Sequence, residues 1–235
     1  MKAIFKKELR GYFYSPIGFV FLAIFFFVAS LFFAMYNIFG GYGDINAVFS
    51  NMTMIFLFLT PVITMRSMAE EKNSKTDQLL LTSPVKISSI VLGKLFATMS
   101  VLAIAMAMTF VYPILLLNFT TPAWGKFIGN YIGFFLMGSA FLSIGIYISA
   151  LTENQIIAAV STFGVLFLLY LADWFAPMIN VGFLSAMLKG ISMTTKFYDF
   201  SMGIINIGSV VYYISIVVVF VSLTVIHIEK RRWSK

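Results

Sequence analysis

Charged residues are absent from six long stretches of the chain, and each of these stretches is mostly apolar. The core of a bilayer is about 30 Å thick and a helix rises about 1.5 Å per residue, so about 20 residues are needed to cross it. The uncharged stretches are residues 11–43, 45–65, 95–125, 127–152, 154–172 and 200–228. Within or slightly beyond them we predict membrane-spanning helices at residues 16–39, 49–65, 95–117, 128–151, 155–175 and 210–228.

The apolar pattern favours helices over a membrane barrel. Barrel strands alternate apolar and polar residues, whereas residues 19–33 and 163–171 are apolar on every side. The predicted fold class is therefore an all-α integral membrane protein, a single domain over residues 1–235 with six transmembrane helices.

Composition supports this class and excludes several kinds of chemistry. Hydrophobic residues make up 60% of the chain and charged residues 11%, whereas an average soluble domain has about 25% charged residues. The chain has no cysteine and one histidine, His227, so neither a metal centre nor a Ser-His-Asp triad is expected. The pairs Gly93-Lys94 and Gly125-Lys126 lack the other residues of a phosphate-binding loop. We therefore expect no catalytic residue and no cofactor bound by this chain.

The distribution of Lys and Arg predicts the orientation, because these residues are retained on the cytoplasmic side of a bacterial membrane. Of the sixteen, all but Lys126, Lys189 and Lys196 fall in the N-terminal segment, the loop between the second and third helices, or the C-terminal tail. We predict a multi-pass protein of the bacterial plasma membrane with both termini cytoplasmic. The net charge of +7 is thus assigned to orientation, and no nucleic-acid partner is expected.

Residues 1–14 precede the first span and have two different faces. Ile4, Phe5, Leu9, Tyr12 and Phe13 share one broad face of a helix, and the opposite face is basic. This pattern predicts an interfacial helix on the inner leaflet that bends into the membrane near Ser15-Pro16. The alternative is a basic segment that only fixes the orientation.

The loop between the second and third spans, residues 66–94, begins with a charged run that extends helix two as far as Glu70 and Glu71. The pair Asn73-Ser74 is expected to end this helix. A short segment with a polar start and an apolar end follows, which Ser74 or Thr76 could cap. A further helix is predicted from Pro84, with Ser83 as its cap, running through Lys86 into the third span.

The loop between the fifth and sixth spans, residues 176–209, is apolar but interrupted by Pro and Gly, which predicts short helices on or in the outer leaflet. None of the spans has an ionisable residue near its middle; Asp173 lies at the outer end of span five. This argues against ion-coupled transport. In span four, Gly129-x-x-x-Gly133 permits close helix packing, either within the subunit, which we favour, or between two subunits.

The inner loop also carries a resemblance. The run from Met68 to Val85, Met-Ala-Glu-Glu-Lys-Asn-Ser-Lys-Thr-Asp-Gln-Leu-Leu-Leu-Thr-Ser-Pro-Val, followed by Ile90-Val-Leu-Gly-Lys, resembles the permease subunits of ABC-2 type transporters. Residues 149–159 and the tail 229–233 resemble the gliding-motility-associated branch of that family.

The resemblance implies a coupling helix between helices two and three that docks on a separate cytosolic ABC ATPase, which binds ATP and Mg²⁺. It implies a second permease, as an identical copy or a paralogue, and re-entrant helices between spans five and six that form an outer gate, with Asp173 and Asp199 as candidate gate residues. Related permeases often have Gly-Thr where this chain has Lys75-Thr76. Carried over by position, the residues implied to take part in coupling are Glu70, Glu71, Thr76, Leu79, Leu80, Leu81 and Pro84.

Two functions therefore remain open at this point. The first is the permease of an exporter, a transport subunit rather than an enzyme. The alternative is a membrane anchor or mechanical transmitter that acts on extracytoplasmic partners, for which an extracytoplasmic accessory subunit would be needed. An intramembrane enzyme is disfavoured, because no ionisable group lies at depth.

Overall fold

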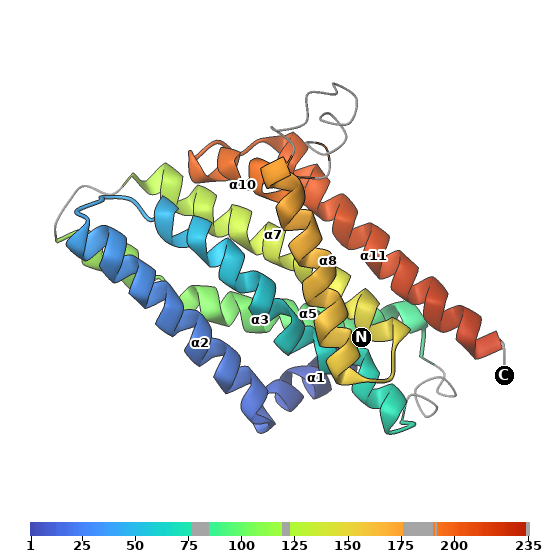
Figure 1. Cartoon of the computed structure of the whole chain (residues 1–235). Helices are drawn as coiled ribbons and strands as arrows, with labels where there is room; N and C mark the ends of the chain where they lie inside the picture. The colour runs from blue at the N-terminus through green and yellow to red at the C-terminus, as the bar shows by residue number, and fades with distance from the viewer. Residues whose placement is uncertain (77–84, 119–122, 176–189, 191, 234–235) are drawn as a thin grey trace.

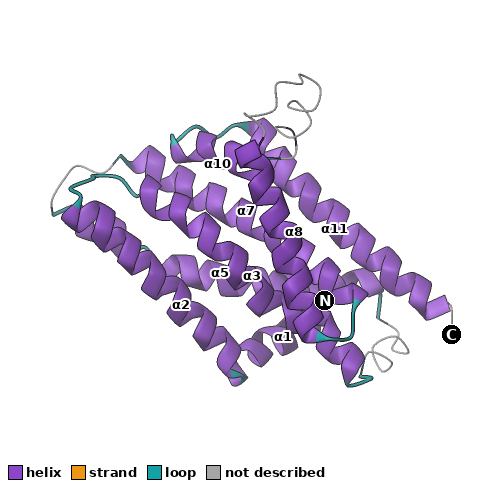
Figure 2. Ribbon diagram, in the orientation of Figure 1, coloured by secondary structure: helices purple, strands orange, loops and turns teal. Residues whose placement is uncertain are grey.

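The computed structural model describes residues 1–76, 85–118, 123–175, 190 and 192–233, apart from the side chains of residues 173, 174, 232 and 233. Within these ranges the regular structure is entirely helical, as Figure 2 shows. Six of the described helical stretches are long and apolar enough to cross a membrane. The prediction of an all-helical membrane protein with six spans is confirmed.

The six spans follow one another along the chain. Their helices are α2 (Pro16–Phe33) continued by η1 (Ala34–Phe39), α3 (Asn46–Asn73), α5 (Ile87–Met108) with α6 (Val111–Leu116), α7 (Trp124–Leu151), α8 (Gln155–Phe175) and α11 (Ile207–Trp233). Two shorter helices, α1 (Lys2–Tyr14) and α10 (Met193–Ser201), complete the described structure.

Two spans are less regular than predicted. The first ends in the π-helical turn η1, where Asn37 Nδ2 donates to the carbonyls of Tyr42 and Asp44 at 2.6 and 2.7 Å. The third is broken between α5 and α6, although a single helix was predicted over residues 95–117. Pro113 has no N–H to donate to the carbonyl of Thr109, and the N–H of Tyr112 takes that carbonyl at 3.0 Å instead.

Helix α7 lies at the centre of the bundle, and small residues along it admit its neighbours. A side chain at Gly129 or Gly133 would overlap Phe200 of α10, and one at Gly145 would overlap Thr64 of α3. The small-residue stripe of span four therefore packs within the subunit. By contrast, most of the apolar side chains of α8 and α11 are exposed or only partly buried, as expected of helices that face lipid.

The bundle has two ends, which Figure 1 shows. We call one the α1 end: it carries α1, the last turns of α3, the start of α5, the α7–α8 connection and the last turns of α11. The other, the α10 end, carries α10. The chain is extended at Ser15, and Pro16 is the first residue of α2, so the predicted helix over residues 1–14 and the bend after it are both present.

Candidate functional site

At the α1 end, helix α3 continues beyond the apolar run for two turns, through Glu70 and Glu71 to Asn73. It ends as predicted, at the pair Asn73-Ser74. The hydroxyl of Ser74 donates to the carbonyl of Glu70 at 2.8 Å, and that of Thr76 donates to the carbonyl of Glu71 at 3.3 Å. Between them, Lys75 has a left-handed backbone with φ of 57°. The Glu70 carbonyl also accepts from the backbone N–H of Ser74 at 2.9 Å, so it is the Glu71 carbonyl that depends on a side-chain donor at the end of α3.

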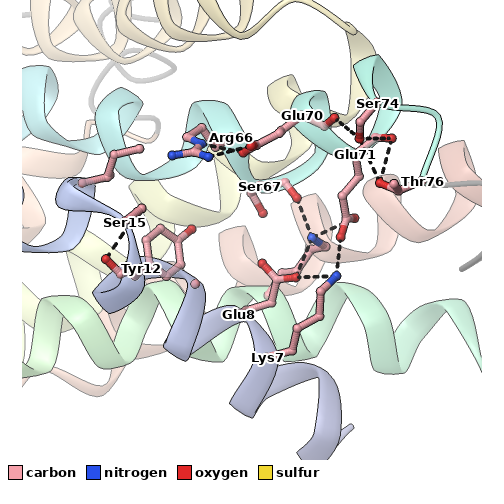
Figure 3. A pocket seen from close by; sticks show the side chains of 13 residues that line it. Lys7, Glu8, Tyr12, Ser15, Arg66, Ser67, Glu70, Glu71, Ser74 and Thr76 are labelled. Carbon is pink, nitrogen blue, oxygen red and sulfur yellow. Dashed lines mark hydrogen bonds and ion pairs between the residues drawn. The ribbon is translucent and has the colours of Figure 1, made fainter.

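The two neighbouring carboxylates of α3 have different surroundings, which Figure 3 shows. Glu70 pairs along its own helix with Arg66, whose Nε and Nη2 donate to it at 2.5 Å, and the Glu70 side chain is 41% exposed. Glu71 turns toward α1 and α5 and is 15% exposed. From the sequence, Glu70 and Glu71 were predicted to have the same role at the end of helix two. In the structure they contact different helices.

Glu71 belongs to a polar cluster that joins three helices and is buried around Lys94. Lys94 of α5 is 1% exposed, and its ammonium contacts Glu71 Oε2 at 2.9 Å, Glu8 Oε1 at 3.0 Å and the carbonyl of Ser67 at 2.6 Å. Lys7 of α1 donates to Glu71 Oε1 at 3.0 Å. We call these five residues, Lys7, Glu8, Ser67, Glu71 and Lys94, the Lys94 cluster. Because an ammonium has three N–H donors, Lys94 is fully satisfied.

The surroundings of α1 shift the pKa values of two of its side chains, Lys7 and Tyr12. Partial burial of Lys7 lowers the pKa of its ammonium, but its hydrogen bond to Glu71 and the charges of Glu71 and Glu8 outweigh burial and raise the pKa above its usual value. Burial raises the pKa of the Tyr12 hydroxyl, which therefore stays protonated and donates to the carbonyl of Ile63 at 3.1 Å.

A glycine lets α1 lie close to α5. A Cβ atom at Gly93 would lie 3.0 Å from Cγ2 of Ile4, closer than nearly all contacts between side chains. Gly93 therefore allows α1 and α5 to approach each other next to Lys94, where the cluster forms.

The opposite side of α3 is held by α7. The hydroxyl of Ser149 donates to the carbonyl of Met65 at 3.0 Å and accepts from the backbone N–H groups of Met68 and Ala69, both at 3.1 Å. Lys72 donates to the carbonyl of Ala150. The last turns of α3 are thus bound by α1 and α5 on one side and by α7 on the other.

The remaining predicted site residues lie elsewhere or outside the described ranges. Leu79, Leu80, Leu81 and Pro84 are not described, nor is the side chain of Asp173. Helix α5 does not run through Lys86 as predicted: the backbone of Lys86 is extended, its carbonyl accepts from the N–H of Ser89 at 3.0 Å, and the helix begins at Ile87.

At the α10 end, Asp199 binds the segment that leads into α11. Its carboxylate accepts from Asn206 Nδ2 at 3.2 Å and from the hydroxyl of Ser209 at 3.3 Å. The gate role of Asp199 stays a prediction. Among the described residues, no group of three or more His, Cys, Asp or Glu side chains could hold a metal ion.

Comparison with known proteins adds one decisive match. The family model described as ABC-2 family transporter protein matches residues 2–200, which is most of the chain. The chain belongs to the ABC-2 transporter family. The match spans α1 to α10 and so includes the whole Lys94 cluster and the Ser149 contacts of this ABC-2 permease. No curated protein matches the chain.

Proposed function

We propose that this chain is the permease subunit of an ABC exporter and that residues 76–81, held at the end of α3, form the helix that docks on a separate cytosolic ATPase. ATP and Mg²⁺ would bind that partner. The observation that carries the proposal is the two-sided attachment of α3: a displacement at Thr76 can reach α1 and α5 through the Lys94 cluster and α7 through Ser149.

A partner ATPase can move the membrane helices only if the segment on which it docks is firmly connected to those helices. A helix end bound on one side could tilt alone, whereas α3 exchanges side-chain bonds with three other helices within about two turns of its end. Movement of the docking segment would therefore be shared by spans two, three and four. Domain movements of this kind are the usual means by which a ligand or hydrolysis event acts at a distance.

The proposed orientation places the α1 end in the cytoplasm of a bacterium, as the distribution of Lys and Arg predicts. The chain has no cysteine, so single cysteines can be introduced without background. Lys75→Cys should react with a membrane-impermeant maleimide only after the cells are opened, and Tyr198→Cys on α10 should react in intact cells. Labelling of Lys75→Cys in intact cells would contradict the orientation.

A second permease, identical or a paralogue, completes the proposed transporter, and residues 176–209 with Asp173 and Asp199 would form its outer gate. The resemblance of residues 149–159 and 229–233 to the gliding-motility-associated branch supports a second candidate: a mechanical transmitter that acts on an extracytoplasmic subunit. Hydrolysis that depends on the permease occurs in both cases, but only the exporter releases a substrate from sealed vesicles.

The docking proposal is tested by Leu79→Asp, Leu80→Asp and Leu81→Asp, each measured by co-purification with the cognate ATPase. A carboxylate forced into a desolvated groove without a partner should cost at least about 2 kcal/mol, which is about a thirtyfold loss of affinity. The matched control is Asn154→Asp, which adds the same charge at the same end of the bundle and keeps the oxygen that accepts from the Ile156 N–H at 2.8 Å. Unchanged binding and hydrolysis in all three leucine variants would contradict docking through this segment.

A further inference from the structure

One buried hydroxyl at the α1 end has no hydrogen-bond partner. Buried Ser and Thr side chains in the spans generally bond to a carbonyl one turn earlier, as Thr60 does to Phe56 at 2.8 Å and Thr64 to Thr60 at 2.9 Å. Ser67 is 3% exposed and its Oγ has no partner. The carbonyl that it would normally use, that of Ile63, already accepts from Tyr12. A buried hydroxyl left in this way costs free energy, which a bound ligand would recover.

Ser67 lines a cleft of about 360 Å³, far larger than the ~30 Å³ of one water molecule. Figure 3 shows Ser67 between Tyr12 and the carboxylates of Glu8 and Glu71. The cleft extends to Ser15 and Ile17, where the chain enters the first candidate span. Its walls come from α1, α2, α3 and α5.

Several hydrogen-bond donors converge on this cleft without a full set of acceptors. Arg66 uses its Nε and one Nη2 bond on Glu70, which leaves three of its five N–H groups. Helix α2, 18 residues long, begins at the cleft with Ser15 as its N-cap, and the Ser15 side chain does not cap it. Because Pro16 has no N–H, the free backbone donors of the first turn of α2 are those of Ile17 and Gly18, and the positive end of the helix dipole lies on this side.

The charges that line the cleft are balanced. Lys7, Arg66 and Lys94 oppose three carboxylates, and those of Glu8 and Glu71 are already bonded to lysines. Glu70 is the most exposed of the carboxylates and has lone pairs that Arg66 does not use. A balanced site disfavours a multiply charged anion and suits a ligand that carries one charge of each sign.

We propose that the cleft binds the headgroup of a zwitterionic phospholipid from the leaflet on the α1 side. The phosphodiester accepts from the Ser67 hydroxyl, the unused N–H groups of Arg66 and the first turn of α2, and the ammonium of the headgroup faces Glu70. The acyl chains then lie along the exposed apolar face of α2. This inference concerns the chain alone and does not depend on docking of an ATPase.

The test uses the full chain in nanodiscs that contain phosphatidylethanolamine and phosphatidylglycerol in equal amounts, followed by release into detergent and native mass spectrometry. The wild type should retain phosphatidylethanolamine, and Arg66→Gln and Ser67→Ala should each retain about tenfold less, as expected when a charge-assisted or buried hydrogen bond is lost. Arg10→Gln, on the exposed side of α1, and Ser100→Ala, whose hydroxyl bonds to its own helix, are the matched controls and should retain as much as the wild type. Inorganic phosphate and soluble phosphoethanolamine, added as competitors, distinguish a lipid from its free headgroup.

A second measurement separates binding from structure. In lipid-free detergent, Ser67→Ala should be as stable to heating as the wild type or more stable, because it removes an unsatisfied hydroxyl. Added phosphatidylethanolamine should stabilise the wild type but not Ser67→Ala. Equal retention by wild type, Arg66→Gln and Ser67→Ala, preference for phosphatidylglycerol, or displacement by phosphate alone would each overturn the proposal.

Discussion

Glu70 and Glu71 are neighbours in the sequence, and the structure predicts that replacing them has different consequences. Glu70→Gln removes one charge from a pair whose side chains are 33% and 41% exposed, and exposed ion pairs contribute about 0–1 kcal/mol. Glu71→Gln leaves the buried ammonium of Lys94 with one carboxylate instead of two. Removal of one partner from a buried pair costs about 3–5 kcal/mol.

The expected cost of Glu71→Gln is lower than that range, because Glu8 still contacts Lys94 and the new amide oxygen can accept from it. We expect a loss of about 2 kcal/mol in the free energy of unfolding. For a chain of this size, that corresponds to a fall in Tm of ~4–8 °C, against at most ~4 °C for Glu70→Gln. Lys94→Met should cost about 3 kcal/mol, because it also removes the donor to the Ser67 carbonyl.

The assay is thermal unfolding of the purified chain in one detergent–lipid mixture, followed by tryptophan fluorescence or by loss of monodisperse protein. The double variant Glu71→Gln with Lys94→Met should lose less stability than the sum of the two single variants, since the second change removes an interaction already broken. Equal shifts for Glu70→Gln and Glu71→Gln, or full additivity in the double variant, would refute the assignment of Lys94 to a three-helix cluster.

Two further comparisons test the packing of α7. Gly145→Ala should destabilise the chain by about 1–3 kcal/mol, because the new Cβ would overlap Thr64. Its control, Gly164→Ala on α8, has open space around the new Cβ and should be neutral or stabilising by up to ~1 kcal/mol. Thermal unfolding measures both variants. Ser149→Ala should cost about 1–3 kcal/mol, because it removes all three hydrogen bonds of the Ser149 hydroxyl to the backbone of α3. Ser143→Ala, whose hydroxyl bonds to its own helix at 2.7 Å, should cost less than 1 kcal/mol, and equal losses would contradict the role given to Ser149.

The sequence was sufficient to predict the spans because the bilayer restricts what an uncharged run of this length can do. Once charges are absent for about 20 residues, the backbone must satisfy its own hydrogen bonds, and a helix follows. The start of α2 at Pro16 and the end of α3 at Asn73 were predicted for equally local reasons. The break at Thr109 could also have been found, since Pro113 removes the donor that a continuous helix requires.

The contacts between helices were not predictable in the same way. Glu8 and Lys94 are 86 residues apart in the chain, and no local pattern assigns one to the other. A signal was nevertheless present: Glu8 is the only acidic residue before Asp44, and Lys94 is the only charged residue in α5. From the sequence, Lys94 contributes to the predicted orientation and to the resemblance, but no ion pair is predicted for it. Glu8, which stabilises the buried ammonium of Lys94, is brought next to it only when α1 packs against α5.

The Lys94 cluster is more informative about geometry than about stability. Apolar residues of similar volume can hold helices together as well as a buried ion pair does, and often better. They would not, however, fix the rotation and depth of α1, α3 and α5 relative to one another. Apolar contacts allow helices to slide, whereas the Lys94 ammonium has three partners at 2.6–3.0 Å and loses them when a helix moves. In the proposed permease, this constraint falls on the helix that precedes the docking segment. The triple variant Glu8→Leu, Glu71→Leu and Lys94→Met replaces the charged groups of the cluster by apolar ones and should therefore retain much of the stability of the wild type. In complex with the ATPase, it should transport less substrate for each ATP hydrolysed. Full retention of the ratio of transport to hydrolysis in that variant would show that packing alone transmits the motion.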